Sequence, residues 1–181
     1  DAIRKIKHKE RLFVRSFGHV NGIVTHGDLQ KQPVRMWLFS LISMIEMQML
    51  RIIREAHPND TWSELLKENR LASAKVLHER RLKLNEDIDL ADCLQFCDKR
   101  EIFLKDSEIL SQVTSPDESK NENDAFYSKV KVESILKKIE KLRDNLAHAQ
   151  VLQESWSNIL ETAEQAGNLL VRLEEIEFPI P

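Results

Sequence analysis

The longest apolar pattern in the chain runs from Val34 to Ala56 and predicts a central helix. Large apolar residues recur there at spacings of three and four, which places them on one broad face of an α-helix. This face is wider than one side of a bundle requires, so we expect the helix to lie at the centre or to contact a partner as well. Its members are Trp37, Leu38, Leu41, Ile42, Ile45, Met49, Leu50 and Ile53, with Met44 and Met47 beside them.

The same helical period continues through the rest of the chain. Residues 61–84, 90–104, 106–110, 126–151 and 155–175 are each predicted to be helical, with short joints between them. Thr61-Trp62-Ser63-Glu64 has the form of a capping box that starts the first of these helices. We therefore expect a mainly α fold, an up-and-down bundle of four or five helices over residues 33–176.

A β pattern precedes the bundle. Residues 12–14 and 20–25 flank the turn-like sequence Ser16-Phe17-Gly18-His19, so they predict a short hairpin. Residues 1–9 are typical of the last turns of a helix, and Pro33 suits the start of the next one. We expect residues 113–124, which are almost entirely polar, to form a mobile loop, and residues 177–181 to form an extended tail.

Composition and charge narrow the classes of function. The 181 residues are 41% hydrophobic and 31% charged, with only four glycines and five prolines, as expected for long helices. The net charge is −3 and the pI is near 6.1. These values exclude a nucleic-acid binder that depends on overall positive charge, so an RNA ligand would need a local basic cleft.

The cysteines and the lengths of the apolar runs indicate in which cellular compartment the protein is expected. Cys93 and Cys97 lie four apart in a helical pattern, where we expect two buried, reduced thiols, and this favours the cytoplasm. The sequence has no signal pattern and no uncharged apolar run of about 18 residues, so neither export nor membrane insertion is predicted. No metal-ligand spacing is present, and no metal is expected. The chain opens at Asp1 without methionine, so we expect it to belong to a longer protein.

Residues 142–149 set chemically capable side chains inside an apolar helix. The apolar stripe of this helix places Arg143 at its edge and points Asp144 and His148 away from the core. Asp144 and His148 are four apart, so the carboxylate can hold the imidazole tautomer and raise its basicity. Such a pair is a means of tuning a general base. The alternative is a solvated helix face with charges at this spacing.

Glu46 interrupts the apolar run of the central helix with a carboxylate. A carboxylate in such a position needs a cationic partner, and Arg143 is one candidate. The alternative is that Glu46 faces solvent.

The sequence Arg143-Asp144-Asn145-Leu146-Ala147-His148 resembles the motif of the HEPN superfamily of helical-bundle proteins. That motif is an Arg, a polar residue, three or so variable residues and a His. The resemblance implies metal-independent RNA cleavage by a site paired across a homodimer. It also implies that His148 is the general base or acid on the ribose 2′-OH and the leaving oxygen. Arg143 would stabilise the transition-state charge, and Asp144 would be the orienting residue.

Residues 22–29, Gly-Ile-Val-Thr-His-Gly-Asp-Leu, resemble the end of a CBS motif, a regulatory unit that usually works in pairs to bind adenine nucleotides. The resemblance implies that Thr25 and Asp28 hold ribose hydroxyls, with an adenine nucleotide as a regulator. Residues 1–32 would then be the C-terminal remnant of a CBS motif, and residues 33–176 a HEPN-like bundle. The alternative for Thr25 and Asp28 is a helix N-cap.

These patterns favour one function and leave two alternatives open. The leading hypothesis is a homodimeric, metal-independent endoribonuclease, regulated by a nucleotide through the CBS region. In the second, the bundle is a non-catalytic dimerisation or ligand-sensing module, with Arg143 and His148 structural or anion-binding. In the third, it is one half of a toxin system, partnered by an antitoxin or a nucleotidyltransferase. None of these predicts a membrane partner.

Overall fold

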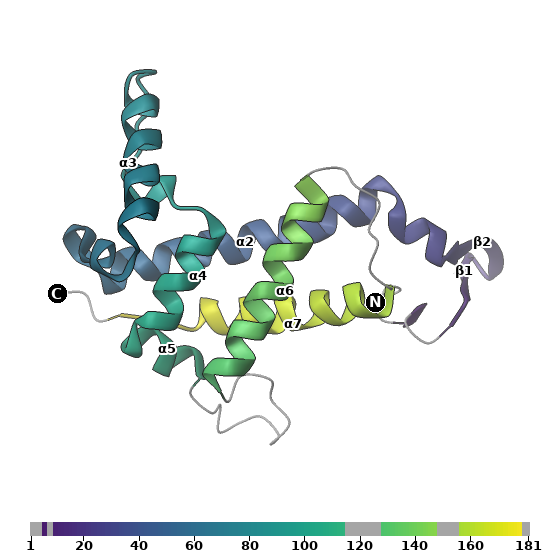
Figure 1. Ribbon diagram of the computed structural model, residues 1–181. Coiled ribbons are helices and arrows are strands. Elements are labelled where there is room, and N and C mark those ends of the chain that lie inside the picture. The colour runs from purple at the N-terminus through teal and green to yellow at the C-terminus, as the bar shows by residue number, and fades with distance from the viewer. Residues whose placement is uncertain (1–4, 7–8, 115–127, 148–155, 179–181) are drawn as a thin grey trace.

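The chain forms a helical bundle with a small hairpin at one end (Figure 1). A computed structural model describes residues 5–6, 9–114, 128–147 and 156–178. The elements are β1 (Arg11–Ser16), β2 (His19–Thr25), the 3-10 helix η1 (His26–Gln30), α2 (Gln32–Ala56), η2 (Pro58–Leu65), α3 (Glu68–Leu82), η3 (Ala91–Cys93), α4 (Phe96–Lys105), α5 (Ser107–Thr114), α6 (Lys129–Ala147) and α7 (Trp156–Glu174).

The core is built around α2. This helix runs through the middle of the bundle with α7 alongside it, while α4 and α6 cross it and α5 packs between them at one end (Figure 1). Ile45, Met49, Ile52 and Ile53 of α2 are fully buried. The predicted mainly α fold with an N-terminal hairpin is confirmed, and α2 is the central helix that its apolar pattern predicted.

The hairpin also matches its prediction. β1 and β2 pair antiparallel, and the turn residues Phe17 and Gly18 both have positive φ, 50° and 84°. Two positive φ angles give a turn whose twist matches that of the strands, which is why glycine is favoured there. On the inner face, Leu12 and Val24 pack against a small cluster of three residues, Ile6, Leu29 and Leu160.

The predicted helix 61–84 is wrong in its first part. Pro58 starts the 3-10 helix η2, in which Asn59 and Asp60 have positive φ, and Lys67 is extended, so α3 begins only at Glu68. The expected capping box is absent from η2, whose first turn has no side-chain cap. Burial explains the break, because η2 turns Trp62 wholly into the core, where its indole N–H donates to Asp60.

α3 does not join the bundle as expected. It stands away from the other helices (Figure 1), and Ala74 is its one buried residue. Its apolar period is interrupted by charged residues, so little of the helix can be buried against the core.

The predicted helix 90–104 is also interrupted. The 3-10 helix η3 ends at Cys93, Leu94 is extended, and α4 begins at Phe96 with Gln95 and Asp98 as a reciprocal capping box. Cys93 and Cys97 therefore do not share one helix face, although both are free thiols, one buried and one half-buried. Burial raises the pKa of both thiols, as expected for unreactive cysteines.

The remaining helices lie near their predicted positions. Asp106 caps α5 through the N–H of Ile109, and α5 extends to Thr114. The predicted ends of the last two helices at residues 126, 151 and 155 lie outside the described residues, as do residues 115–124 of the predicted mobile loop and residues 179–181 of the predicted tail.

α2 is also the one long apolar helix among the described residues. It is 25 residues long and contains a window with a mean hydropathy of 1.4, so by length and composition it could cross a membrane. Because Leu38, Ile45 and Met49 are buried among the other helices, we interpret α2 as the core helix of the bundle. On its outer side, Trp37, Met44 and Met47 are exposed.

The packing of α6 gives a test of the fold. Ile139→Ala should lower the free energy of unfolding by about 2–5 kcal/mol, because it leaves a cavity in the core where the fully buried Ile139 side chain was. Val130→Ala, at an exposed position of the same helix, should change it by no more than about 0.5 kcal/mol. Urea unfolding followed by circular dichroism measures both, and equal effects would contradict the packing of α6.

Candidate functional site

The candidate site lies where α2, α4 and α6 meet. Arg143 of α6 is partly exposed, and its Nε lies 3.5 Å from Oε2 of Glu46 on α2. The predicted pairing of Glu46 with Arg143 is therefore confirmed. Arg143 lies at the edge of the buried stripe, and Asp144 is exposed, as the helical period indicated.

Glu46 has a second cationic partner that the sequence did not suggest. Lys99 of α4 places its Nζ 2.9 Å from Oε1 of Glu46, and the Lys99 side chain is only 6% exposed. A buried ammonium group is very costly without a carboxylate at this distance. Lys99 and Glu46 therefore neutralise each other inside the bundle.

This arrangement decides what Arg143 can do. Since Lys99 already balances the charge of Glu46, the carboxylate orients the guanidinium without cancelling its charge fully. Among the described residues, the other acidic group in contact with Arg143 is Asp144, with Nη1 and Oδ1 3.4 Å apart. That contact is exposed and weak. Arg143 thus presents an oriented cation at the surface.

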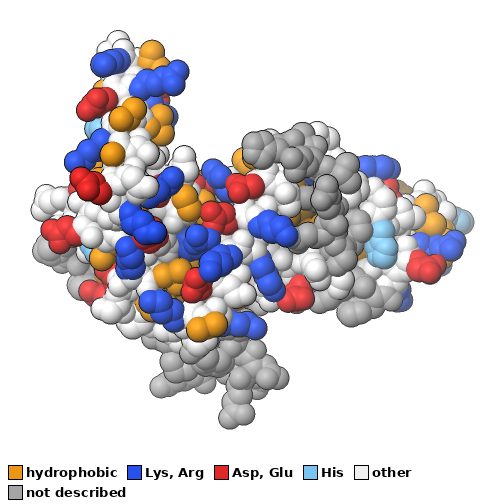
Figure 2. All heavy atoms as spheres, in the orientation of Figure 1, with side chains coloured by type: hydrophobic (Ala, Val, Ile, Leu, Met, Phe, Trp, Pro, Cys, Tyr) orange, Lys and Arg blue, Asp and Glu red, His pale blue; other side chains and the backbone are white. Residues whose placement is uncertain are grey.

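The helix that carries Arg143, α6, has more basic than acidic residues. Within α6, six cationic residues accompany three carboxylates, although the chain as a whole is acidic. Lys and Arg side chains are numerous over α4 and α6 in Figure 2, and Arg100 of α4 pairs with Glu140 of α6. Lys137 and Lys138 likewise pair with Glu133 and Glu161, so α6 carries a modest net positive charge with carboxylates among its cations.

His148 and its expected contact with Asp144 lie outside the described residues, because the described part of α6 ends at Ala147. Among the described residues, no group of three His, Cys, Asp or Glu side chains is placed to hold a metal ion.

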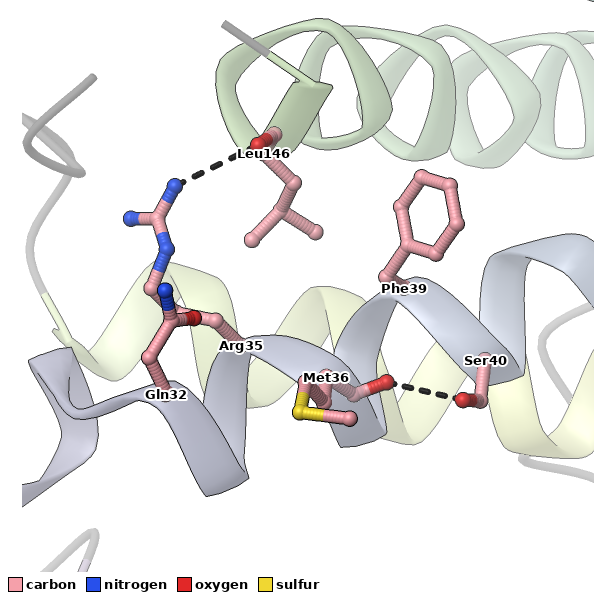
Figure 3. A pocket seen from close by; sticks show the side chains of 6 residues that line it. All are labelled: Gln32, Arg35, Met36, Phe39, Ser40 and Leu146. Carbon is pink, nitrogen blue, oxygen red and sulfur yellow. Dashed lines mark hydrogen bonds between the residues drawn. The ribbon is translucent and has the colours of Figure 1, made fainter. Parts of the chain in front are cut away.

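A pocket opens beside the C-terminal end of α6. Its volume is about 220 Å³, and it lies between α6 and the first turns of α2 (Figure 3). Arg35 Nη2 donates a hydrogen bond of 3.3 Å to the carbonyl of Leu146, which stabilises the last turn of α6. The lining residues are Gln32, Arg35, Met36, Phe39, Ser40 and Leu146.

Thr25 and Asp28 are close together and form a local cap. Asp28 Oδ2 accepts hydrogen bonds from the Thr25 amide (2.7 Å) and hydroxyl (2.9 Å), and Oδ1 lies 2.6 Å from Lys31 Nζ. The N-cap alternative is therefore realised at the start of η1. The hydrogen bonds from Lys31 and Thr25 lower the pKa of Asp28 to about 2.

His57 joins two elements that the sequence did not connect. Its Nδ1 lies 3.2 Å from the Thr61 hydroxyl, and its Nε2 lies 2.9 Å from Asp106 Oδ2, although the latter pair is not aligned as a hydrogen bond. Because Asp106 also caps α5, we interpret this hydroxyl–imidazole–carboxylate series as a structural tie between the end of α2 and the start of α5.

Comparison with known proteins gives no further assignment: no protein-family model, curated protein or solved structure matches the chain. The HEPN and CBS resemblances therefore rest on the motifs at residues 143–148 and 22–29 and stay predictions.

The buried Glu46–Lys99 pair predicts that removing one partner destabilises the fold far more than removing one partner of an exposed pair. Glu46→Ala should cost about 3–5 kcal/mol, because it leaves the Lys99 ammonium buried without its carboxylate. Lys138→Met, which removes an exposed pair with Glu161, should cost no more than about 1 kcal/mol. The double variant Glu46→Leu/Lys99→Met should recover much of the loss. Chemical unfolding tests this, and a Glu46→Ala variant as stable as wild type would refute the pairing.

The cap predicts how Asp28 titrates. Its pKa in the folded chain is about 2, below the value of about 3.9 for an unperturbed Asp. The stabilisation is therefore fully present above about pH 4 and is lost as the pH falls towards 2. Carboxyl carbon NMR shifts should give a midpoint near 2 for Asp28, rising in Lys31→Ala. A midpoint near 4 in the wild type would disprove the cap.

Proposed function

We propose that the chain is a metal-independent endoribonuclease of the HEPN type that acts as a homodimer. The observation that carries the proposal is the oriented Arg143: Glu46 holds its guanidinium at the surface, and Lys99 balances the Glu46 charge. An oriented cation of this kind can stabilise the charge that develops on a phosphoryl group during transfer. The net positive charge of α6 supports an RNA substrate.

The proposed reaction uses a nucleophile within the RNA. His148 removes the proton from a ribose 2′-OH, and the 2′ oxygen attacks the adjacent phosphorus. The bond from phosphorus to the 5′ oxygen breaks, and that oxygen takes a proton from an acid, which the protonated His148 or the His148 of a second copy can supply. The products are a 2′,3′-cyclic phosphate and a 5′-OH. Arg143 stabilises the charge on the phosphoryl oxygens, and Asp144 orients His148.

A second copy of the chain is the proposed occupant of the exposed face of α2. Trp37 and Met44 lie on the side of α2 opposite Glu46, and Met47 lies beside them, so the three residues form an exposed apolar face. An exposed apolar face of this kind often marks an interface, and a two-fold axis would let it cover itself.

Nucleotide regulation is a further part of the proposal. The outer face of the hairpin exposes the cross-strand pair Phe13 and Ile23, which the rest of a CBS unit would cover. An adenine nucleotide whose ribose bound at Thr25 and Asp28 would share the Asp28 carboxylate with Lys31 and Thr25, because both residues already contact that carboxylate. A cytoplasmic location agrees with two unbridged thiols.

One observation favours the alternative of a non-catalytic dimerisation or ligand-sensing module. Arg143 contacts two carboxylates, Glu46 and Asp144, as a structural arginine would. A module of this kind would keep the dimer and the Arg143 contacts without cleaving RNA. The partnered toxin alternative makes the same chemical predictions as the ribonuclease and differs only in its inhibitor.

The ribonuclease proposal predicts large losses from small changes. His148→Ala and Arg143→Ala should each lower cleavage by about 100-fold or more. Arg143→Ala should keep the bundle folded, because Lys99 continues to partner Glu46. EDTA should have no effect, and substrates with 2′-deoxy at the scissile position should resist cleavage. Single-turnover assays on labelled RNA, with mass analysis of the ends, measure these outcomes. Wild-type activity in His148→Ala, or no cleavage of several RNAs by a folded dimer, would leave the module alternative.

The dimer is tested separately. Met47→Glu should turn a dimer into a monomer, because the two-fold axis brings the new charge into the interface on both copies. Val76→Glu, at an exposed position of α3, should leave the mass unchanged. Light scattering at micromolar concentration distinguishes the two. A wild-type monomer, or a Met47→Glu variant that remains a dimer, would rule out this interface.

A further inference from the structure

The pocket between α2 and the end of α6 has the features of a site for a flat aromatic ligand. Phe39 rises from α2 towards Leu146 of α6, and the two side chains face the same space (Figure 3). Leu146 is nearly buried, whereas Phe39 is 48% exposed, so a large part of the phenyl ring is open to a ligand. The pocket therefore joins an accessible aromatic ring to a fixed aliphatic wall.

Polar groups surround this apolar centre. Arg35 is held at the rim by its hydrogen bond to the Leu146 carbonyl, which fixes a positive charge beside the pocket. Gln32 lies on the same rim and carries an amide with both donors and an acceptor (Figure 3). Ser40 donates its hydroxyl proton to the Met36 carbonyl, so its oxygen can still accept. Such a rim suits a ring with hydrogen-bonding edges and an attached anion.

We propose that this pocket holds one unstacked nucleobase of a single-stranded RNA, with the ring of Phe39 as its stacking platform. Proteins read single-stranded RNA by stacking bases on aromatic side chains and by hydrogen bonds to the base edges. The Arg35 guanidinium faces the phosphate of the same nucleotide, and the Gln32 amide faces the base edge. This inference rests on the proposed ribonuclease function and names the form of RNA that the site takes.

The position of the pocket relative to Arg143 supports the assignment. Two turns of α2 separate Phe39 from Glu46, roughly 10 Å along the axis at 1.5 Å per residue. Glu46 contacts Arg143, so a base on Phe39 lies within a few nucleotides of a phosphate at Arg143. Paired bases are stacked inside a helix and cannot reach a pocket of this kind. The substrate is therefore single-stranded beside the scissile phosphate, and Phe39 is a specificity-determining residue.

The test measures binding apart from cleavage. The probe is a fluorescein-labelled 2′-O-methyl RNA of mixed sequence, which has no free 2′-OH and cannot be cleaved, used single-stranded and annealed to its complement. Fluorescence anisotropy gives the dissociation constants for the whole chain and its variants. Phe39→Ala removes the ring, Phe39→Leu keeps an apolar side chain without a ring, and Phe39→Trp keeps a stacking surface. Phe17→Ala, at the fully exposed tip of the hairpin, is the matched control. Unmodified RNA is assayed for cleavage in parallel.

We expect Phe39→Ala and Phe39→Leu to bind the single strand about 5- to 100-fold more weakly, the usual range for loss of one base–aromatic stack. Phe39→Trp and Phe17→Ala should bind like the wild type, and the duplex should bind more weakly than the single strand. Wild-type affinity in Phe39→Leu would show that stacking on the ring does not contribute to RNA binding and would overturn the inference. Equal affinity for the duplex would also overturn it. If Phe39→Ala binds and cleaves like the wild type, only the inference fails; if the wild type neither binds nor cleaves RNA, the proposed function fails with it.

Discussion

A carboxylate placed in an apolar helix is the constraint that organises the centre of this bundle. The helical period of α2 places Glu46 at the edge of its buried face, largely shielded from solvent, and a carboxylate in that position must find cationic partners. It finds Lys99 on α4 and Arg143 on α6, so one side chain ties together three helices that are distant in the sequence. The pairing with Lys99 serves the fold, and the pairing with Arg143 fixes a cation at the surface. Structure and proposed chemistry thus depend on the same atoms.

The parts of the fold that follow from local pattern were predictable. The apolar face of α2 and the Phe17–Gly18 turn match their sequence signals because period and turn chemistry act within a few residues. The breaks around Trp62 and Leu94 were not, because they depend on tertiary contacts. Trp62 is fully buried only if the chain leaves the helical path there. At the second break, Asp98 caps α4 and is also held by Arg70 of α3, with Nε of Arg70 2.7 Å from Oδ1 of Asp98. Neither contact is visible in the local pattern.

Of the candidate site, too, the sequence predicted the parts that depend on local pattern and missed those that depend on tertiary contacts. The helical period put Arg143 at the edge of its stripe and marked Glu46 as needing a partner, and both features are present in the structure. Lys99 was missed because the predicted start of its helix was wrong. Its spacing of three from both Phe96 and Ile102, two buried residues, was the signal that could have identified it. The Phe39 pocket is formed by residues of α2 and α6 that are more than a hundred positions apart in the sequence, so no local pattern predicts it.

The central claim is that Glu46 acts on the reaction through Arg143, and a double-mutant cycle on cleavage tests it most directly. Glu46→Gln should lower the single-turnover rate in the wild-type chain, because it releases the oriented guanidinium. The same change should have little further effect in an Arg143→Ala background, where there is no guanidinium to orient. Stability measured on the same variants accounts for the loss of the Lys99 contact. Rate effects of Glu46→Gln that are equal in both backgrounds would contradict the account, because Glu46 would then act independently of Arg143.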